Sequence, residues 1–211
     1  MQNWITALRR GNEPATRKAT AGESGALPNA IRKLWIGENK LFRDHLLRLD
    51  PESRRSRFGS SVGEYFIDDY AARALRPNSV VHGFLVEGSL RAAAELRPFG
   101  DHFPCEAEAA FSVERDWQNC GVGTALLDRT ILAARNRGIR TIYMSCLVDN
   151  RRMQRVARNY EAELRFEADD VIGEVANPGP TPLSLFREFI ADGHGFATAI
   201  LDVHGRMFRA A

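Results

Sequence analysis

The sequence has few of the features that mark extracellular, metal-binding or membrane proteins. Its three cysteines are odd in number and lack CxxC spacing, so we expect reduced thiols and a cytoplasmic protein. No apolar run approaches the roughly 18 residues of a membrane-spanning helix, and the five histidines show no pairing at metal-ligand spacing. The formal net charge is only +2. We therefore expect no metal site, no nucleic-acid partner and no membrane partner.

The rest of the composition is typical of a globular protein. The 211 residues are 44% hydrophobic and 27% charged, enough to bury a core without disulfides. Residues 1–30 combine basic side chains with scattered Thr, Gly and Pro, which favours a mobile tail over a targeting or partner-binding arm. We assign residues 31–176 to one folded domain. Residues 177–211 open with alternating prolines and then read as a helical appendage, which either packs on the sheet or forms a homodimer.

Hydrophobic periodicity predicts an alternating order of strands and helices. The strands are expected at 31–36, 79–88, 89–98, 106–114 and 139–148, with a last hairpin at 163–176 around Asp169 and Asp170. The helices are expected at 38–49, 52–61, 62–75, 124–137 and 151–162. Asp50 and Asn150 are the expected caps, and Gly138 the expected glycine after a helix end. This order predicts a mixed sheet with helices on both faces.

The segment QNCGVGT, residues 118–124, joins a strand to a helix. Gly121 and Gly123 lack Cβ atoms, so the backbone can turn sharply and approach a ligand closely. The N–H groups that open the helix then attract an anion such as a phosphate. The alternative is a turn that merely needs glycine. A Walker loop is excluded because no lysine follows, and a dinucleotide fingerprint because Leu126 stands where a third glycine is needed.

The stretch AFSVERDWQNCGVGTALLDRTILAARNRGIRTIYMSCLVDNRRM resembles the acetyl-CoA-binding core of the GCN5-related N-acetyltransferases, the GNAT family. Its signature, [Q/R]-x-x-G-x-[G/A], is filled by Gln118, Gly121 and Gly123. The resemblance covers roughly residues 31–176, and LDPESRRSRFGS is similar to the branch that acetylates protein lysines. It implies the α/β (α+β) GNAT fold, in which a mixed, mostly antiparallel central sheet contains a parallel, splayed strand pair and carries helices on both faces.

The resemblance also implies that acetyl-CoA is the co-substrate. Phe111 and Val113, with Ser112 between them, would form a strand edge for the pantetheine amides, and the Phe111 N–H would polarise the thioester carbonyl. Asn150 would touch the pantetheine arm. After Gln118, the backbone N–H groups expected to hold the pyrophosphate are those of Asn119, Cys120, Gly121, Val122, Gly123 and Thr124.

Acetylation of an amine needs a general base, because an ammonium ion has no lone pair. Glu108 lies just before Phe111 on the same predicted strand, and lysine-modifying relatives have a similar Ala-Glu dipeptide whose glutamate is the base. The alternatives are a solvated strand glutamate, or Glu106, which has the same side-chain parity.

The general acid is harder to assign. Many GNAT members place a tyrosine where this chain has Ala157, and Tyr160, one turn later, is expected to pack instead. Cys146 lacks an identifiable histidine partner, which argues against covalent transfer. We predict direct transfer of an acetyl group from acetyl-CoA to a primary amine, on a protein lysine or a small molecule. The alternative is a noncatalytic acyl-CoA-binding sensor of the same fold.

Two groups of arginines have two interpretations each. Arg54, Arg55 and Arg57 either line a cleft near the 3′-phosphate of coenzyme A or form a solvated helix face. In the helix after Asn150, solvation is favoured over phosphate contact for Arg151, Arg152, Arg155 and Arg158.

Overall fold

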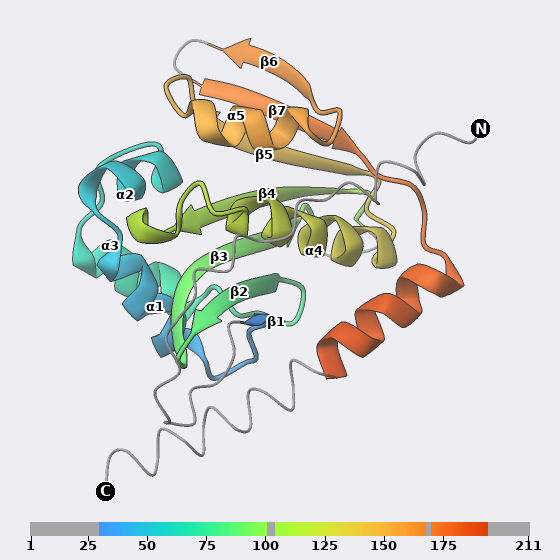
Figure 1. The fold of residues 1–211 in the computed structure, drawn as a ribbon, viewed down its shortest axis with the longest axis horizontal. Helices are drawn as coiled ribbons and strands as arrows, with labels where there is room; N and C mark the ends of the chain where they lie inside the picture. Colours follow the sequence, from blue (N-terminus) through green and yellow to red (C-terminus); the bar gives the residue numbers. More distant parts are fainter. Residues whose placement is uncertain (1–29, 101–103, 168–169, 194–211) are drawn as a thin grey trace, which may run out of the picture.

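A seven-stranded sheet organises the chain in the computed structural model, which describes residues 30–100, 104–167 and 170–193. The strands are β1 Ala30–Lys33, β2 Val80–Val86, β3 Ser89–Pro98, β4 Glu106–Val113, β5 Thr141–Leu147, β6 Glu163–Glu167 and β7 Asp170–Ala176. They lie in the order β1-β2-β3-β4-β5-β7-β6, and β4–β5 is the parallel pair among antiparallel neighbours (Figure 1). The predicted mixed, mostly antiparallel sheet is confirmed.

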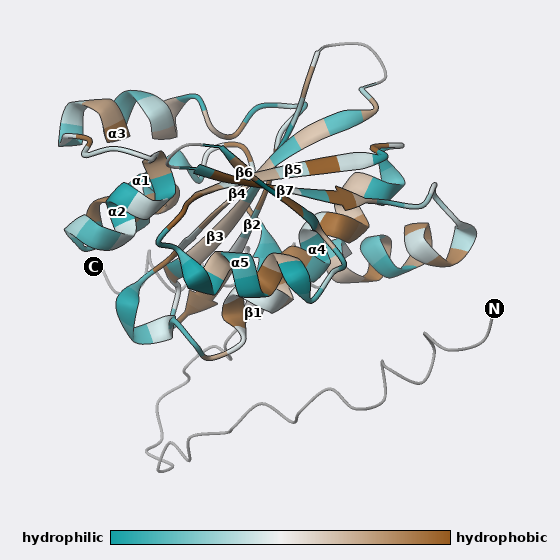
Figure 2. Ribbon diagram, turned by 90° about the horizontal axis from the view of Figure 1, so that it is seen from above, coloured by the Kyte–Doolittle hydropathy of each residue, from teal (hydrophilic) through white to brown (hydrophobic). Residues whose placement is uncertain are grey.

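Helices cover both faces of this sheet. The helices on one side are α1 Asn39–Arg48, α2 Pro51–Phe58 and α3 Glu64–Ala72, and those on the other are α4 Val122–Asn136 and α5 Arg151–Arg158 (Figure 1). Alternation along the strands supplies both cores. Ala93 of β3 packs with the α1 cluster around Phe42, whereas its neighbour Ala94 packs with Leu126 of α4. Apolar colour is accordingly concentrated in the central strands (Figure 2).

Several element ends follow the predicted signals. The Asp50 side chain accepts hydrogen bonds from the backbone N–H groups of Glu52 and Ser53, both at 3.1 Å, and Pro51 opens α2. Asn150 caps α5 through a 3.1 Å bond from the Met153 N–H. Gly138, with φ +74°, follows the end of α4 as expected.

Other element ends differ from prediction. α4 begins at Val122 rather than Thr124, because Gly121 itself adopts the left-handed conformation and caps the helix. β1 ends at Lys33, before the predicted end at Ile36. In the last hairpin Asp170 already belongs to β7, and Asp169 lies outside the described residues.

Strands β4 and β5 separate after a short paired segment. They pair at Glu106–Thr141, Ala107–Ile142 and Glu108–Tyr143, and β4 then continues to Val113 beside β3 alone. The predicted splay of the parallel pair is therefore confirmed. The opening lies at the end of β4 that leads into the glycine loop.

The appendage forms a helix over residues 182–193 that contacts the end of α4. Asn136 Nδ2 donates to the Ser184 carbonyl at 2.9 Å and to Glu188 Oε2 at 2.6 Å, and Arg137 pairs with Glu188 at 2.7 Å. Its large exposed apolar side chains are Leu183, Leu185, Phe186, Phe189 and Ile190. The described part of the appendage thus packs on α4 by polar contacts, and the homodimer stays a prediction.

A buried histidine makes the fold sensitive to acid. His82 of β2 is 5% exposed, and its Nδ1 has no hydrogen-bond partner among the residues that the structure describes. Burial, together with the nearby charges of Arg129 and Arg137, lowers the pKa of His82 to about 3. The ordinary value, about 6.5, applies in the unfolded chain. The unfolded state therefore binds more protons between these values, and stability present above pH 6.5 is lost as the pH falls.

We expect His82 alone to lower the free energy of unfolding by about 2 kcal/mol between pH 7 and pH 5. His82→Leu replaces the ring with an apolar side chain of similar size and should flatten this dependence. Urea unfolding at both pH values measures the difference. A variant that loses as much stability as the wild type over this interval would contradict the assignment to His82.

Candidate functional site

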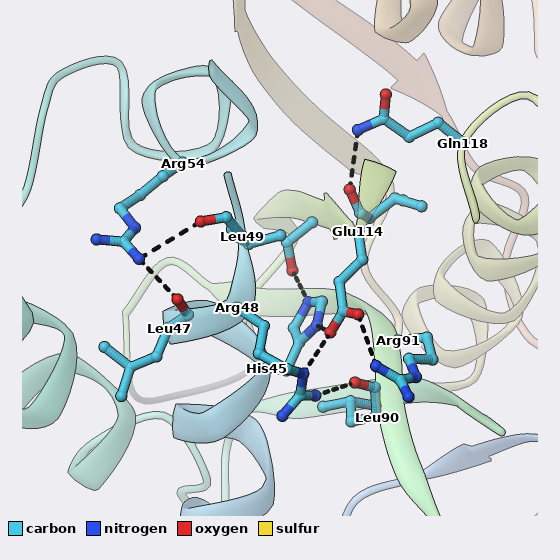
Figure 3. A network of polar contacts seen from close by, with 11 residues as sticks. His45, Leu47, Arg48, Leu49, Arg54, Leu90, Arg91, Glu114 and Gln118 are labelled. Atoms are coloured by element: carbon cyan, nitrogen blue, oxygen red, sulfur yellow. Dashed lines mark hydrogen bonds and ion pairs between the residues drawn. The ribbon is translucent and has the colours of Figure 1, made fainter. Parts of the chain in front are cut away.

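A buried carboxylate fixes the end of β4 (Figure 3). Glu114 Oε1 accepts from Arg48 Nε at 3.0 Å and lies 3.1 Å from His45 Nδ1, while Oε2 accepts from Arg91 Nη1 at 3.0 Å. His45 Nε2 lies 2.9 Å from the Ser112 hydroxyl. Burial lowers the pKa of His45, so its neutral ring donates to Glu114 and accepts from Ser112. This network ties α1 and β3 to the strand that enters the glycine loop.

Gln118 connects the loop to three elements. Its Nε2 donates to the Val113 carbonyl and to Ser53 Oγ, both at 3.0 Å, and its Oε1 accepts from Arg152 Nη1 at 2.6 Å. The signature glutamine therefore holds β4, α2 and α5 around the loop. Figure 3 shows it at the end of the Glu114 network.

The glycine loop presents backbone N–H groups without helical acceptors at the start of α4. Gly121 has φ +79°, and no side chain in the described part of the chain caps this helix end, whose first turn has no acidic residue. The first helical bond there runs from the Ala125 N–H to the Gly121 carbonyl, so the preceding N–H groups have no helical acceptor. A Cβ added at Gly121 or Gly123 would meet nothing within 4 Å. The loop therefore has both the donors and the space that a pyrophosphate needs.

The backbone of β4 alternates between β3 and the open splay. The Glu114 N–H donates to the Arg91 carbonyl and the Phe99 N–H to the Glu106 carbonyl, which identifies the pairs that are hydrogen-bonded in this antiparallel register. Alternation then directs the backbone groups of Ser112 toward β3 and those of Phe111 and Val113 the other way. Phe111 and Val113 thus face the side where β5 has separated, as a pantetheine-binding edge requires.

Two adjoining pockets lie in the splay. The first, about 300 Å³, extends from the glycine loop between α2 and α5, and the second, about 270 Å³, contains Glu108. The residues that line both, which we call the neck, are Ser56, Arg57, Phe111, Asn150 and Met153. The predicted cofactor-binding residues that line the first pocket are Phe111, Ser112, Val113, Gln118, Asn119, Gly121, Gly123, Thr124 and Asn150. Cys120, which is exposed, and Val122, which packs in the core, line neither.

Glu108 and Glu106 lie on the same face of the sheet, but their side chains have different surroundings. Glu108 lines the second pocket and is half-buried, whereas its neighbours Ala107 and Ala109 are buried in the core beneath α4. Glu106 is exposed and accepts a 3.2 Å hydrogen bond from the Tyr143 hydroxyl. Only Glu108 of the two therefore faces the pocket beside the neck.

The sequence profile of the Acetyltransferase (GNAT) family matches residues 44–160, which is 117 of the 211 residues. The chain belongs to the GNAT family. The profile runs from within α1 through the glycine loop to the end of α5, so it includes the elements around the two pockets except β7, whose Asp170 lines the second pocket.

Solved GNAT structures share the fold. The GNAT domain of S. lividans PAT is 21% identical with a TM-score of 0.61, covering 72% of this chain and 96% of that one. A cAMP-binding acyltransferase from Mycobacterium smegmatis is 22% identical with a TM-score of 0.52, covering 79% of this chain and 50% of that one, so this chain spans half its length. The Salmonella typhimurium protein yncA, solved with acetyl-CoA, is 17% identical with a TM-score of 0.52, covering 70% and 93%.

In this GNAT chain the side chains of Tyr160 and Cys146 are not suited to catalysis. The Tyr160 hydroxyl donates to Asp128 of α4 at 2.6 Å, and Tyr160 lines neither pocket. Cys146 lines the second pocket, but burial and the nearby charges of Asp170 and Asp149 raise its thiol pKa to about 11. Cys146 is thus a protonated thiol at neutral pH, unsuited to nucleophilic attack. Among the described residues no group of acidic, histidine and cysteine side chains could hold a metal.

The three arginines of α2 differ in their contacts, and the four arginines of α5 are all exposed, as the favoured interpretation predicts. Arg54 caps the end of α1 by donating to the Leu47 carbonyl at 2.8 Å, and Arg55 is exposed, 3.7 Å from Asp149. Arg57 is buried and lines both pockets. On α5, Arg152 and Arg155 line the first pocket beside the loop, where they add positive charge.

A buried charge cluster beneath α2 was not predicted. Glu95 of β3 is 1% exposed, pairs with Arg57 and with Arg97, the latter at 2.6 Å, and accepts from the Tyr70 hydroxyl at 2.9 Å. The available signal was Glu95 in an alanine-rich strand of a sheet with helices on both faces, since both sides of such a strand are buried.

No helix among the described residues is long and apolar enough to cross a membrane.

Gly121→Ala should weaken binding of acetyl-CoA by about tenfold or more, because a side chain in this conformation costs about 1–2 kcal/mol and the backbone moves to relieve it. Gly138→Ala is the control, since its φ of +74° is similar to the +79° of Gly121 but it lines neither pocket. Calorimetric titration and thermal unfolding of both variants separate strain from binding. Equal weakening of binding in both would refute phosphate binding by the glycine loop.

Proposed function

We propose that this chain transfers an acetyl group from acetyl-CoA to a primary amine. The observation that carries the proposal is the splay of β4 and β5, which joins the glycine-loop pocket to the Glu108 pocket through a shared neck. The loop N–H groups of the first pocket suit the pyrophosphate, and the backbone of Phe111 and Val113 suits the pantetheine arm. The thioester then reaches the neck beside Glu108.

Glu108 acts as the general base in this proposal. Its carboxylate removes a proton from the acceptor amine, directly or through water, and the nitrogen attacks the thioester carbonyl carbon. The new C–N bond forms as the C–S bond breaks, the nitrogen releases its second proton to solvent, and the coenzyme A thiolate leaves and takes a proton from solvent. The Phe111 N–H faces the splay and stabilises negative charge on the carbonyl oxygen. No covalent enzyme intermediate is needed, which agrees with the protonated thiol of Cys146.

Protein lysine is the acceptor we favour over a small-molecule amine. Glu108 and Asp170 both line the second pocket, and two carboxylates favour a cationic ammonium group there. The segment LDPESRRSRFGS, similar to the lysine-acetylating branch, supplies Ser56, Arg57, Phe58 and Gly59 to the same pocket. The domain limits 31–176, the tail, the appendage and the cytoplasmic location stay predictions.

Thiol release from acetyl-CoA tests this function. The protein is incubated with lysine-containing peptides and, separately, with a panel of small amines, and acetylated products are identified by mass spectrometry. Turnover of peptides above that of small amines supports the proposal, and the reverse order supports a small-molecule enzyme. Tight calorimetric binding of acetyl-CoA without thiol release would support the sensor alternative, which the engagement of Tyr160 with Asp128 favours.

A further inference from the structure

Arg57 reaches the neck with an unused hydrogen-bond donor. Its side chain is 9% exposed, and Nη2 donates to Glu95 and to the Tyr70 hydroxyl. Nε is sealed without a partner. Nη1 also makes no hydrogen bond with the described residues. Unlike Nε, however, it is accessible to solvent. Arg57 lines both pockets, so the neck is the open space next to this side chain.

We infer that Arg57 Nη1 donates a hydrogen bond to the thioester carbonyl oxygen of acetyl-CoA. This inference rests on the proposed function, which places the thioester in the neck. Phe111 lines the same neck, so its N–H and the guanidinium form a pair of donors for one oxygen. As the amine attacks, the π electrons of the carbonyl move to this oxygen and return when the C–S bond breaks. Donors placed beforehand stabilise that charge.

The surrounding cluster holds the guanidinium in place. Its Cζ lies 4.8 Å from the Phe58 ring centroid and 5.4 Å from that of Tyr70, and Glu95 binds the edge that carries Nη2. Glu95 also pairs with Arg97, so these three ionised groups carry one net positive charge. A positive charge with a fixed orientation beside the neck favours an oxygen that becomes negative. Glu95 is therefore a positioning residue, whereas Arg57 touches the reacting group.

Paired variants separate this role from folding. Arg57→Met alone leaves the buried Glu95 with Arg97 as its one cationic partner, so the variant to use is the double substitution Arg57→Met with Glu95→Gln, which removes both charges. Arg54→Met is the control, because Arg54 is a partly buried arginine of the same helix that lines neither pocket. Thermal unfolding establishes that each variant is folded before its site is measured.

The direct readout is the carbonyl ¹³C resonance of acetyl-CoA labelled at that carbon. Binding to the wild type and to Arg54→Met should move the resonance downfield, and binding to the double variant should move it less. In turnover with the preferred amine, the double variant should lose about 100-fold or more in kcat and in kcat/KM equally, as loss of a transition-state donor does. An equal resonance in the double variant and the wild type would overturn the inference.

Two further outcomes are diagnostic. A higher KM for the amine with unchanged kcat would mean that Arg57 binds the acceptor, and would also overturn the inference. A wild type that shifts the resonance but releases no thiol would refute the proposed function while leaving the Arg57 contact supported. Absence of acetyl-CoA binding to the wild type would refute both.

Discussion

Glu108→Gln will lower kcat for amine acetylation by about 100- to 10,000-fold, the usual contribution of a general base. Glutamine keeps the shape of the side chain but accepts no proton from the acceptor amine. The remaining rate will be proportional to the fraction of the acceptor that is unprotonated. Because the pKa of a lysine amine is near 10.4, this rate should rise about tenfold per pH unit through neutrality. Thiol release measured from pH 6 to pH 9 gives both results.

Glu106→Gln is the matched control, because Glu106 lies on the same strand and the same sheet face. Its carboxylate contacts Tyr143 and lines neither pocket, so its loss should leave kcat unchanged. Similar losses in both variants would show that charge on this face matters rather than a base at one position. Full activity in Glu108→Gln would exclude the role proposed for Glu108.

The glycine loop was predictable because its function depends on local sequence. A strand, two glycines and a helix start lie consecutively, so the backbone chemistry of Gly121 and Gly123 follows from the chain itself. The family signature assigned the backbone N–H groups of all the loop residues to the ligand, and that assignment stays a prediction. The side chain of Val122 turns into the core as the first residue of α4, because Gly121 caps the helix immediately before it.

Strand alternation alone does not distinguish Glu108 from Glu106. Residues two apart on a strand share a face, and what distinguishes them is where β5 separates from β4. Pairing ends at Glu108 and Tyr143, so Glu108 lies at the edge of the opening and Glu106 beside a paired strand. A strand register is a tertiary property, set by packing of both sheet faces.

The Glu95 cluster could not be assembled from sequence because its members are distant along the chain. Arg57 precedes Glu95 by 38 residues and Tyr70 precedes it by 25. Helix α2 was predicted, but its arginines were expected to be solvated or to lie near the 3′-phosphate of coenzyme A. The structure places Arg57 alone under the helix, where a charge is stable only beside an opposite charge.

Glu95→Ala will lower the free energy of unfolding by about 3–5 kcal/mol, the cost of removing one partner from a buried ion pair. Arg57 then lies buried without a carboxylate, and the Tyr70 hydroxyl loses its acceptor. Asp69→Ala is the control, since it breaks an exposed pair with Arg73 on α3 and should cost under about 0.5 kcal/mol. Urea denaturation of both variants at pH 7 gives the comparison.

The pH dependence of Glu95→Ala identifies the charge as the cause. Burial alone would raise the pKa of Glu95, but the charges of Arg57 and Arg97 outweigh burial and hold it below its ordinary value near 4.5. A lowered folded pKa contributes stability that is present above pH 4.5 and lost as the pH falls toward the folded value. The difference between wild type and Glu95→Ala should therefore narrow below pH 4.5. If the difference in free energy of unfolding between the two proteins stays constant below pH 4.5, the loss comes from packing and not from charge. That result would contradict the role of Glu95 in orienting Arg57.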